Sequence, residues 1–399
     1  MLLIVATSIS LIIANSAVGE GYQAFWQWKL GGLSLEHWVN DGLMAVFFLL
    51  IGLELERELY SGELSDLRNA LLPIAGALGG ICFPALIHFS LNAGTATQAG
   101  IAIPMATDIA FALGILALLG SRVPASLKVF LAALAVIDDL GAIVVIAVFY
   151  TADLSLAYLL GALGALGVLI LLNRVFVVMS LLPYLVGGAV MWFLLLKSGV
   201  HATIAGVLLA FAIPYSARQD DQASPSHRLE HFLHHPVAFL ILPIFALANT
   251  GIAIGADWHE RLTTSNSIGI FAGLVAGKPI GITLLCFAAV GLGLARLPLD
   301  LAWRHIAGAG FLGGIGFTMS IFITNLAFVE DGQTVVDSKM AILAASVIAG
   351  ALGFLWLTLF GKPTGVDTDP STMDLETHEQ GADLHGKTLL AVLARGDAL

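Results

Sequence analysis

Two adjacent aspartates, Asp138 and Asp139, lie in the middle of residues 129–149, VFLAALAVIDDLGAIVVIAVF. This run is apolar and long enough to cross a bilayer as one helix. An acidic side chain at the centre of a membrane helix costs roughly 2.5 to 3.5 kcal/mol on insertion scales, so the pair does not serve stability. Neighbouring residues of an α-helix point about 100° apart, so one carboxylate can face a water-filled passage and the other a neighbouring helix. The pair predicts ion chemistry.

The surrounding composition is that of a polytopic membrane protein. Of 399 residues, 58% are hydrophobic and 11% charged, and the mean hydropathy is +0.93. A soluble chain carries about 25% charged residues, which disfavours the alternative of a buried acid dyad in a soluble helix. The apolar runs are continuous and about twenty residues long, whereas a transmembrane β-barrel has alternating segments of about ten. The net charge of -11 is not typical of nucleic-acid binding, and we expect no nucleic-acid partner.

Hydropathy and turn signals predict an all-α fold of twelve transmembrane helices. With the N-terminus inside, ten lysines and arginines fall in cytoplasmic loops and four outside, which predicts that both termini are cytoplasmic. We expect residues 1–361 to form the membrane domain and the acidic segment 362–399 to be a disordered cytoplasmic tail. The predicted helices are 1–15, 37–60, 66–92, 99–119, 125–150, 155–174, 181–196, 199–214, 229–253, 268–290, 303–328 and 337–361.

Two of these helices carry features that break a helix. In the fourth, Pro104 precedes a further buried acid, Asp108, and a proline inside a helix removes a hydrogen bond and clashes with the preceding turn. The eleventh contains Gly313, Gly314 and Gly316. Interrupted segments at matching positions of two halves predict a transporter site on an inverted repeat, with helices three to five matching ten to twelve. The alternative is that the glycines only permit close packing.

One base also lies inside the membrane. Lys278 falls in FAGLVAGKPIGITLLCF, within the tenth predicted helix. A lone buried ammonium needs an acidic partner, so we expect it opposite a mid-membrane aspartate, Asp138.

Two other patterns, a phosphate-loop motif and a group of histidines, do not indicate a ligand. GADLHGKT, residues 381–388, satisfies the phosphate-loop pattern but has no strand before it, so we expect no nucleotide. The histidines at 227, 231, 234 and 235 include an i, i+4 pair that could hold a metal, but a titrating surface cluster is favoured because cysteines and a third clear ligand are missing. We expect no cofactor and no enzymatic activity.

Several segments together resemble the NhaA family of bacterial sodium/proton antiporters. They are FFLLIGLELERELYSG, AIPMATDIAFALGILALLGSRVP, LAVIDDLGAIVVIAVFYT, LKSGVHATIAGV, ILPIFALANTG, GKPIGI and GIGFTMSIFI, spread over residues 40–325. The resemblance implies a twelve-helix inner-membrane antiporter, multi-pass in the lipid bilayer, whose unwound fourth and eleventh helices cross near the midplane. It also implies a homodimer, often with the loop after the first helix at the interface, and a role in salt tolerance and pH homeostasis.

The same resemblance assigns roles to individual residues. Asp138 and Asp139 look like the ion-binding pair, Thr107 and Asp108 like the polar residues at the helix crossing, and Lys278 like the buried lysine. Glu56 departs from the pattern, because a base is expected there. The pH-responsive region would correspond to Glu54, Glu58, Glu230, His231 and His234, with His201 on the opposite side.

These residues define a testable mechanism of exchange. Burial favours the protonated form of a carboxylic acid and an adjacent cation favours the ionised form, so proton and cation compete for one site. Oxygens of Asp138, Asp139 and Thr107 suit sodium or lithium, whereas Asp108 would offset the helix dipoles. If two groups, including Lys278, release protons per sodium, the cycle moves net charge.

Two other functions remain alternatives on the residues alone. An intramembrane aspartyl protease also uses two membrane aspartates, but in YD and GxGD contexts, whereas this chain has TD and IDDLG. A passive cation channel would carry sodium without proton counterflux.

Overall fold

The computed structural model describes residues 2–150, 154–216, 224–329 and 331–362. The expected tail beyond Lys362, including residues 381–388, lies outside the described residues. The regular secondary structure of the described residues is helical apart from one two-stranded hairpin, β1 with β2. Its elements are α1 (Leu2–Ala14), α2 (Gly19–Gln27), β1 (Lys29–Leu30), β2 (Leu33–Ser34), α3 (Leu35–His37), α4 (Met44–Tyr60), α5 (Leu67–Asn92), α6 (Ile109–Leu119), α7 (Ala125–Phe149), α8 (Leu156–Arg174), α9 (Leu181–Ser198), α10 (Ile204–Ala212), α11 (Pro225–Pro236), α12 (Leu242–Thr250), α13 (Trp258–Leu262), α14 (Ser265–Ala272), α15 (Lys278–Gly291), α16 (Trp303–Gly313), α17 (Phe317–Ala327) and α18 (Gly332–Phe360).

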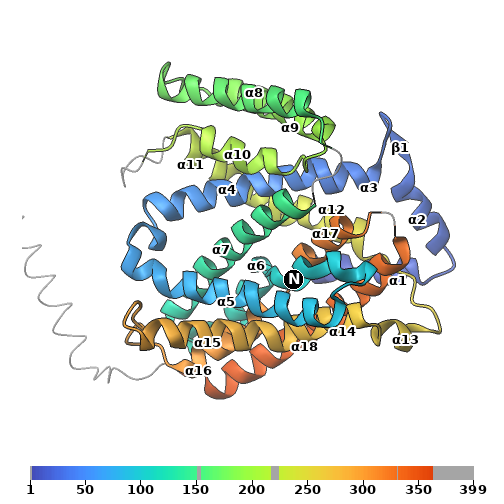
Figure 1. Cartoon of the computed structure of the whole chain (residues 1–399), viewed down its shortest axis with the longest axis vertical. Coiled ribbons are helices and arrows are strands. Elements are labelled where there is room, and N and C mark those ends of the chain that lie inside the picture. The colour runs from blue at the N-terminus through green and yellow to red at the C-terminus, as the bar shows by residue number, and fades with distance from the viewer. Residues whose placement is uncertain (1, 151–153, 217–223, 330, 363–399) are drawn as a thin grey trace, which may run out of the picture.

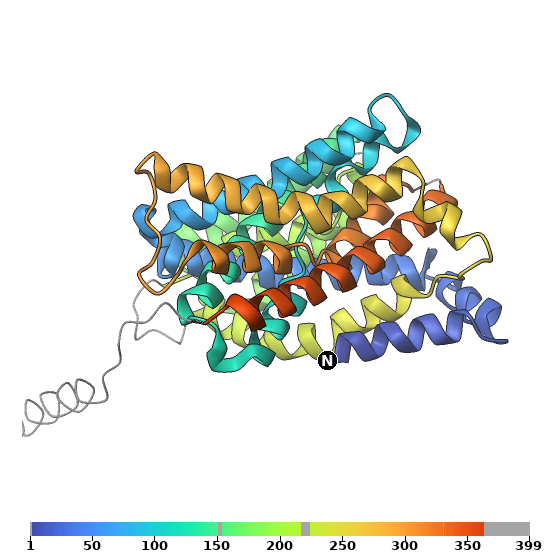
Figure 2. The ribbon, with the colours of Figure 1, turned by 90° about the horizontal axis from the view of Figure 1, so that it is seen from below.

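Every predicted membrane segment contains a helix in the structure. Nine helices of the described residues are long and apolar enough to span a bilayer. The bent pairs α1 with α2 (114°) and α16 with α17 (46°) raise this number to eleven at most, against the twelve that the sequence predicts. Three spans are continuous through π-helical turns, η1 (Trp38–Leu43), η5 (Val237–Ile241) and η6 (Gly273–Gly277). In Figure 1 the helices α4, α8 and α15 run across the view, whereas α7 crosses the bundle obliquely. In Figure 2, turned by 90°, α15 again runs across the view. The all-α polytopic fold is therefore confirmed.

The eighth predicted helix is shorter than expected. Residues 199–214 were predicted to be helical throughout, but α10 covers only Ile204–Ala212. Gly199 ends α9 in the left-handed region at φ +85°, and the chain turns before α10 begins. A left-handed glycine after a helix is a stop signal that an apolar pattern alone does not reveal.

The third to fifth segments and the tenth to twelfth segments form equivalent contacts. The third, α5, packs on the fifth, α7, and the tenth, α14 with η6, packs on the twelfth, α18. The third and tenth also pack on one another, as do the fourth and eleventh. If the twelve predicted segments cross the membrane in turn, the third and tenth run in opposite directions, as an inverted repeat requires.

The contact between α5 and α15 depends on two glycines. A Cβ on Gly79 would lie 2.0 Å from the carbonyl oxygen of Gly281, and a Cβ on Gly281 would lie 2.1 Å from that of Gly79. Small residues let membrane helices approach to backbone contact, which in lipid replaces the hydrophobic driving force between helices. This approach brings Lys278, at the start of α15, toward the interior.

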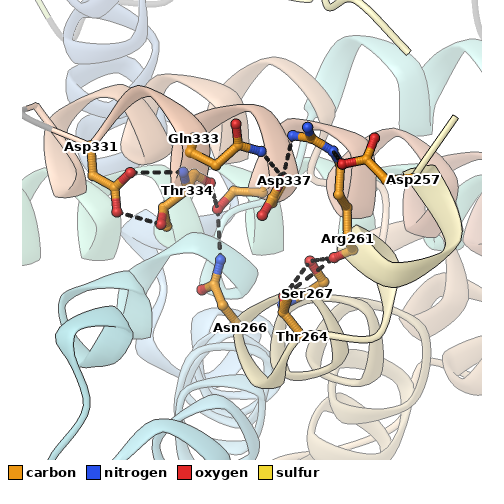
Figure 3. A network of polar contacts seen from close by, with 10 residues as sticks. Asp257, Arg261, Thr264, Asn266, Ser267, Asp331, Gln333, Thr334 and Asp337 are labelled. Atoms are coloured by element: carbon orange, nitrogen blue, oxygen red, sulfur yellow. Dashed lines mark hydrogen bonds and ion pairs between the residues drawn. The ribbon is translucent and has the colours of Figure 1, made fainter. Parts of the chain in front are cut away.

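A polar network ties the loop before α14 to α18 (Figure 3). Arg261 donates to Asp257 at 2.9 Å and to Asp337 at 3.1 Å. Asn266 donates to Ser338 Oγ at 2.8 Å. These contacts lie at the end of the bundle that the charge pattern places outside, and they fix the tenth span against the twelfth.

The glycine contact makes a prediction about stability. We expect Gly281→Ala to lower the melting temperature of the purified protein, because overpacking costs about 1–3 kcal/mol. Gly164→Ala on α8 is the matched control, because a Cβ there meets nothing within 4 Å. Thermal unfolding in detergent measures both variants. Equal melting temperatures would contradict backbone contact between α5 and α15.

Candidate functional site

The fourth and eleventh segments are both interrupted, and they meet at their interruptions. The 3₁₀ segment η3 (Ala96–Met105) ends before an extended stretch, and α6 begins at Ile109. In the eleventh segment, α16 ends at Gly313 and α17 begins at Phe317. The expected breaks are therefore present, at residues 106–108 and 314–316.

Backbone groups freed by one break are bonded by the other. Asp108 N donates to the carbonyl of Ile315 at 2.6 Å, and Thr107 Oγ1 lies 2.9 Å from the carbonyl of Gly313. Ser320 Oγ donates to the carbonyl of Ile103 at 2.7 Å. Irregular backbone survives at membrane depth only where protein satisfies its polar groups. The two broken segments satisfy one another.

Asp108 contacts the first turns of two helices. Its Oδ1 accepts from Phe111 N at 3.2 Å and so caps α6. Its Oδ2 accepts from the backbone N of Thr318 at 3.1 Å and from the hydroxyl of that residue, in the first turn of α17. A carboxylate at a helix N-terminus offsets the positive end of the helix dipole. Asp108 therefore lies where the dipole hypothesis requires.

Asp138 and Lys278 form a fully buried pair. Lys278 Nζ donates to Asp138 Oδ2 and also, at 2.8 Å, to Thr107 Oγ1. Thr107 Oγ1 in turn lies 2.7 Å from Asp138 Oδ2. Since a hydroxyl has one proton, Thr107 donates either to Asp138 or to Gly313 at one time. The structure thus places the lysine opposite the aspartate that the sequence predicts.

Asp139 is buried beside this pair, and the part of the chain that the structure describes offers it no hydrogen-bond partner. It is 1% exposed, and neither carboxylate oxygen is bonded to any described residue. Asp138 Oδ1 is also without a partner among these residues. Asp139 experiences the negative charges of Asp138 and Asp108, with Lys278 as the opposing charge. Three buried acceptor oxygens without a partner among the described residues are the groups that a proton or a cation would satisfy.

A second cluster of charges joins α4 to α11. Arg57 is at its centre and pairs with Glu230 and, at 3.1 Å, with Glu58. His234 Nε2 lies 3.4 Å from Glu54 and 3.9 Å from Glu230. Four of the residues predicted for the pH-responsive region are therefore in one network, held together by an arginine.

The other two residues predicted for that region lie outside the network. His231 is exposed, and the described part of the chain offers it no hydrogen bond or ion pair. His201 Nε2 lies 2.8 Å from the carbonyl of Tyr150, at the end of α7. No group of three or more His, Cys, Asp or Glu residues within the described ranges has the geometry of a metal site.

Several residues of the site are not anticipated by sequence reasoning. Thr318 and Ser320 hold the crossing, and Ser346 Oγ accepts from Phe317 N at 3.1 Å at the start of α17. Thr318 and Ser320 are polar residues directly after a glycine-rich break, which is the signal that could have identified them. Buried Glu56 accepts from Ser226 at 3.1 Å, and this contact has no such signal.

Comparisons with known proteins show the family of this chain. The family model for Na+/H+ antiporter 1 matches residues 1–357. A protein of Dechloromonas aromatica called Na(+)/H(+) antiporter NhaA is 72% identical over 360 residues, which cover 90% of this chain and 92% of the relative. A protein of the same name from Cytophaga hutchinsonii is 59% identical over 359 residues, which cover 90% of this chain and 92% of the relative. The Na(+)/H(+) antiporter NhaA 2 of Klebsiella pneumoniae is 50% identical over 347 residues, which cover 87% of this chain and 91% of the relative.

Fold and comparisons together define a secondary active transporter of the membrane and not an enzyme. The chain belongs to the Na+/H+ antiporter 1 family.

Proposed function

We propose that Asp138 and Asp139 are the site at which sodium and protons compete. One observation carries the proposal: the Asp139 carboxylate is buried and has no hydrogen-bond partner among the described residues, next to an aspartate that is already paired with Lys278. An ionised carboxylate without a counter-charge is costly in a dry site, so Asp139 needs either a proton or a cation. Sodium and lithium both fit, because carboxylate and hydroxyl oxygens are ligands for hard cations.

The exchange cycle follows from these contacts. When sodium enters, it is held by oxygens of Asp139, Asp138 and Thr107, and the proton on Asp139 leaves. Sodium then competes with Lys278 for Asp138, the ammonium loses its counter-charge, and desolvation favours release of a second proton. When protons return from the opposite side, they displace sodium. Two protons against one sodium move net charge, so membrane potential drives the exchange.

The crossing provides the framework for this exchange. Thr107 contacts both Asp138 and the break of the eleventh segment, so a shift of the ion site is coupled to the crossing. Asp108 stabilises the N-terminal ends of α6 and α17 without binding sodium. Alternating access then requires movement of the two broken segments around a fixed site.

The wider setting is proposed from the charge pattern and the family. The protein resides in the bacterial inner membrane with both termini in the cytoplasm, and it exports sodium or lithium against incoming protons. It acts as a homodimer, and the β1–β2 hairpin supports this because Trp28 and Leu30 expose large side chains next to unpaired strand edges. The network around Arg57 sets the response to cytoplasmic pH.

The aspartate pair makes the central prediction. We expect Asp138→Asn and Asp139→Asn each to lower sodium-driven proton flux on the order of 100-fold or more, because the amide cannot ionise. Asp108→Asn is the matched control and is expected to weaken sodium affinity only. Lumenal pH in reconstituted vesicles, on addition of sodium, lithium, potassium or choline, measures the flux. Normal exchange in either pair variant would refute the assignment.

The role of Lys278 needs two variants. Lys278→Arg keeps a positive charge for Asp138, but a guanidinium does not release a proton. We expect it to remain folded and to lose the sodium-driven current in a concentration-jump experiment on proteoliposomes. Lys278→Gln is expected to lose the current and also stability, since removing one partner of a buried pair costs about 3–5 kcal/mol. A normal current in Lys278→Arg would leave the lysine a purely structural role.

The cluster at Arg57 makes a prediction about pH. Activity is expected to rise with pH as carboxylates lose their protons and become available to sodium. Glu230→Gln or His234→Ala should shift the pH of half-maximal activity by roughly one unit, because each variant removes one charge contact from the network. His231→Ala is the matched control because it lies outside the network. Profiles are compared at saturating sodium, and unchanged midpoints in all variants would assign the pH dependence to the aspartate pair alone.

A further inference from the structure

An apolar groove of about 870 Å³ opens between α15, α16 and α18. These helices lie at the edge of the bundle opposite α8 and α9 (Figure 1). The volume is within the range of roughly 300–1,000 Å³ that is typical of ligand pockets. Among its lining side chains, only Thr283, Trp303 and Trp356 carry a polar atom. The indole of Trp356 already donates to the carbonyl of Arg304 at 2.8 Å.

The position of the groove in the membrane identifies the chemistry of its occupant. It lies within spans, and lining residues such as Ile280, Leu284 and Phe287 are about half exposed. Along α15 and the turn before it, the lining runs from Val275 to Phe287, which is about 18 Å at 1.5 Å per residue. One leaflet of the hydrocarbon core is about 15 Å thick, half of the whole. The groove therefore has the length of one lipid acyl chain.

The two ends of the groove differ. One end reaches Val275 and Pro279, on either side of Lys278, whose ammonium faces Asp138 in the interior. This end is at the depth of the ion site. The other end is at Trp303 and Phe287, whose rings pack edge to face at 5.1 Å. Tryptophans mark the interface between hydrocarbon and headgroups.

Basic residues gather at the tryptophan end. Arg304 follows Trp303 directly, is exposed, and donates to the carbonyl of Lys362 at 3.2 Å. Arg296 lies in the loop between α15 and α16 and is also exposed. Residues 288–329 contain these two bases and one acid, Asp300, and Lys362 is a third base next to Arg304. Basic side chains beside a cleft between membrane helices recognise anionic lipid headgroups.

We propose that this groove binds one anionic phospholipid, with an acyl chain between α15, α16 and α18 and the phosphate at Arg304 and Lys362. A zwitterionic lipid offers the same chain, but its net charge is zero, so the bases add selectivity for the anionic form. The chain tip packs against η6, the π-helical turn that precedes Lys278. A bound lipid stabilises the folded form by mass action.

The test compares lipid binding by the full-length protein and three variants. Ala307→Trp fills the groove, and Arg304→Gln with Lys362→Gln removes charge from its basic end. Ala288→Trp is the matched control, because Ala288 is an exposed alanine of α15 that does not line the groove. Each protein is purified in detergent and titrated with dioleoyl phosphatidylglycerol or dioleoyl phosphatidylcholine. Native mass spectrometry counts bound lipids, and thermal unfolding measures stabilisation.

The wild type and Ala288→Trp are expected to bind one phosphatidylglycerol in preference to phosphatidylcholine. Ala307→Trp should bind it roughly tenfold or more weakly, since losing the burial of two methylene groups is enough for that change. The charge variant should bind both lipids equally. Three results would overturn the proposal: equal binding of both lipids by the wild type, unchanged binding by Ala307→Trp, or a shift of Ala307→Trp from dimer to monomer, which would make the groove an interface between copies. None of these readouts depends on transport.

Discussion

The absence of water in the bilayer core governs this structure, because every backbone polar group there must be bonded within the protein. Two interrupted helices at the midplane would be unstable alone. Here Asp108 and Thr107 of the fourth segment bond the carbonyls of Ile315 and Gly313 in the eleventh. Each interruption is thus stabilised by hydrogen bonds to the other. The cost of two breaks is offset at one place, and that place contains the buried carboxylates.

The same constraint decides how charge is held at the crossing. Asp108 accepts three hydrogen bonds from the first turns of α6 and α17, which leaves little capacity for a transported cation. Asp139 accepts none from the described residues, although it is equally buried. The different roles that we propose for Asp108 and Asp139 therefore rest on their hydrogen bonds, because the two residues are equally buried. Asp138 is intermediate, because one of its oxygens is bonded and the other has no partner within the described ranges.

Much of this arrangement could be predicted from sequence, because a charge in an apolar run has few physical explanations. The depth of Asp138 and Lys278 indicates a buried pair, and Pro104 with three glycines indicates two breaks. The sequence does not reveal that Thr318 N and Oγ1 hold Asp108, since hydroxyls are common in membrane helices. The sequence also does not tell which of His231 and His234 joins the network around Arg57. The two residues lie on different faces of α11, so that His234 lies beside Glu54 and His231 faces solvent.

Close packing links the ion site to the membrane surface. The backbone contact of Gly79 with Gly281 fixes α15 against α5, so Lys278 is held on a helix that cannot approach further. A Cβ at Gly314 would lie 2.3 Å from the carbonyl oxygen of Leu274, which belongs to the turn just before Lys278. The eleventh segment therefore cannot move toward this turn at its break without displacing it. Since the other side of the turn lines the apolar groove, the lysine that pairs with Asp138 lies between the crossing and the surrounding lipid.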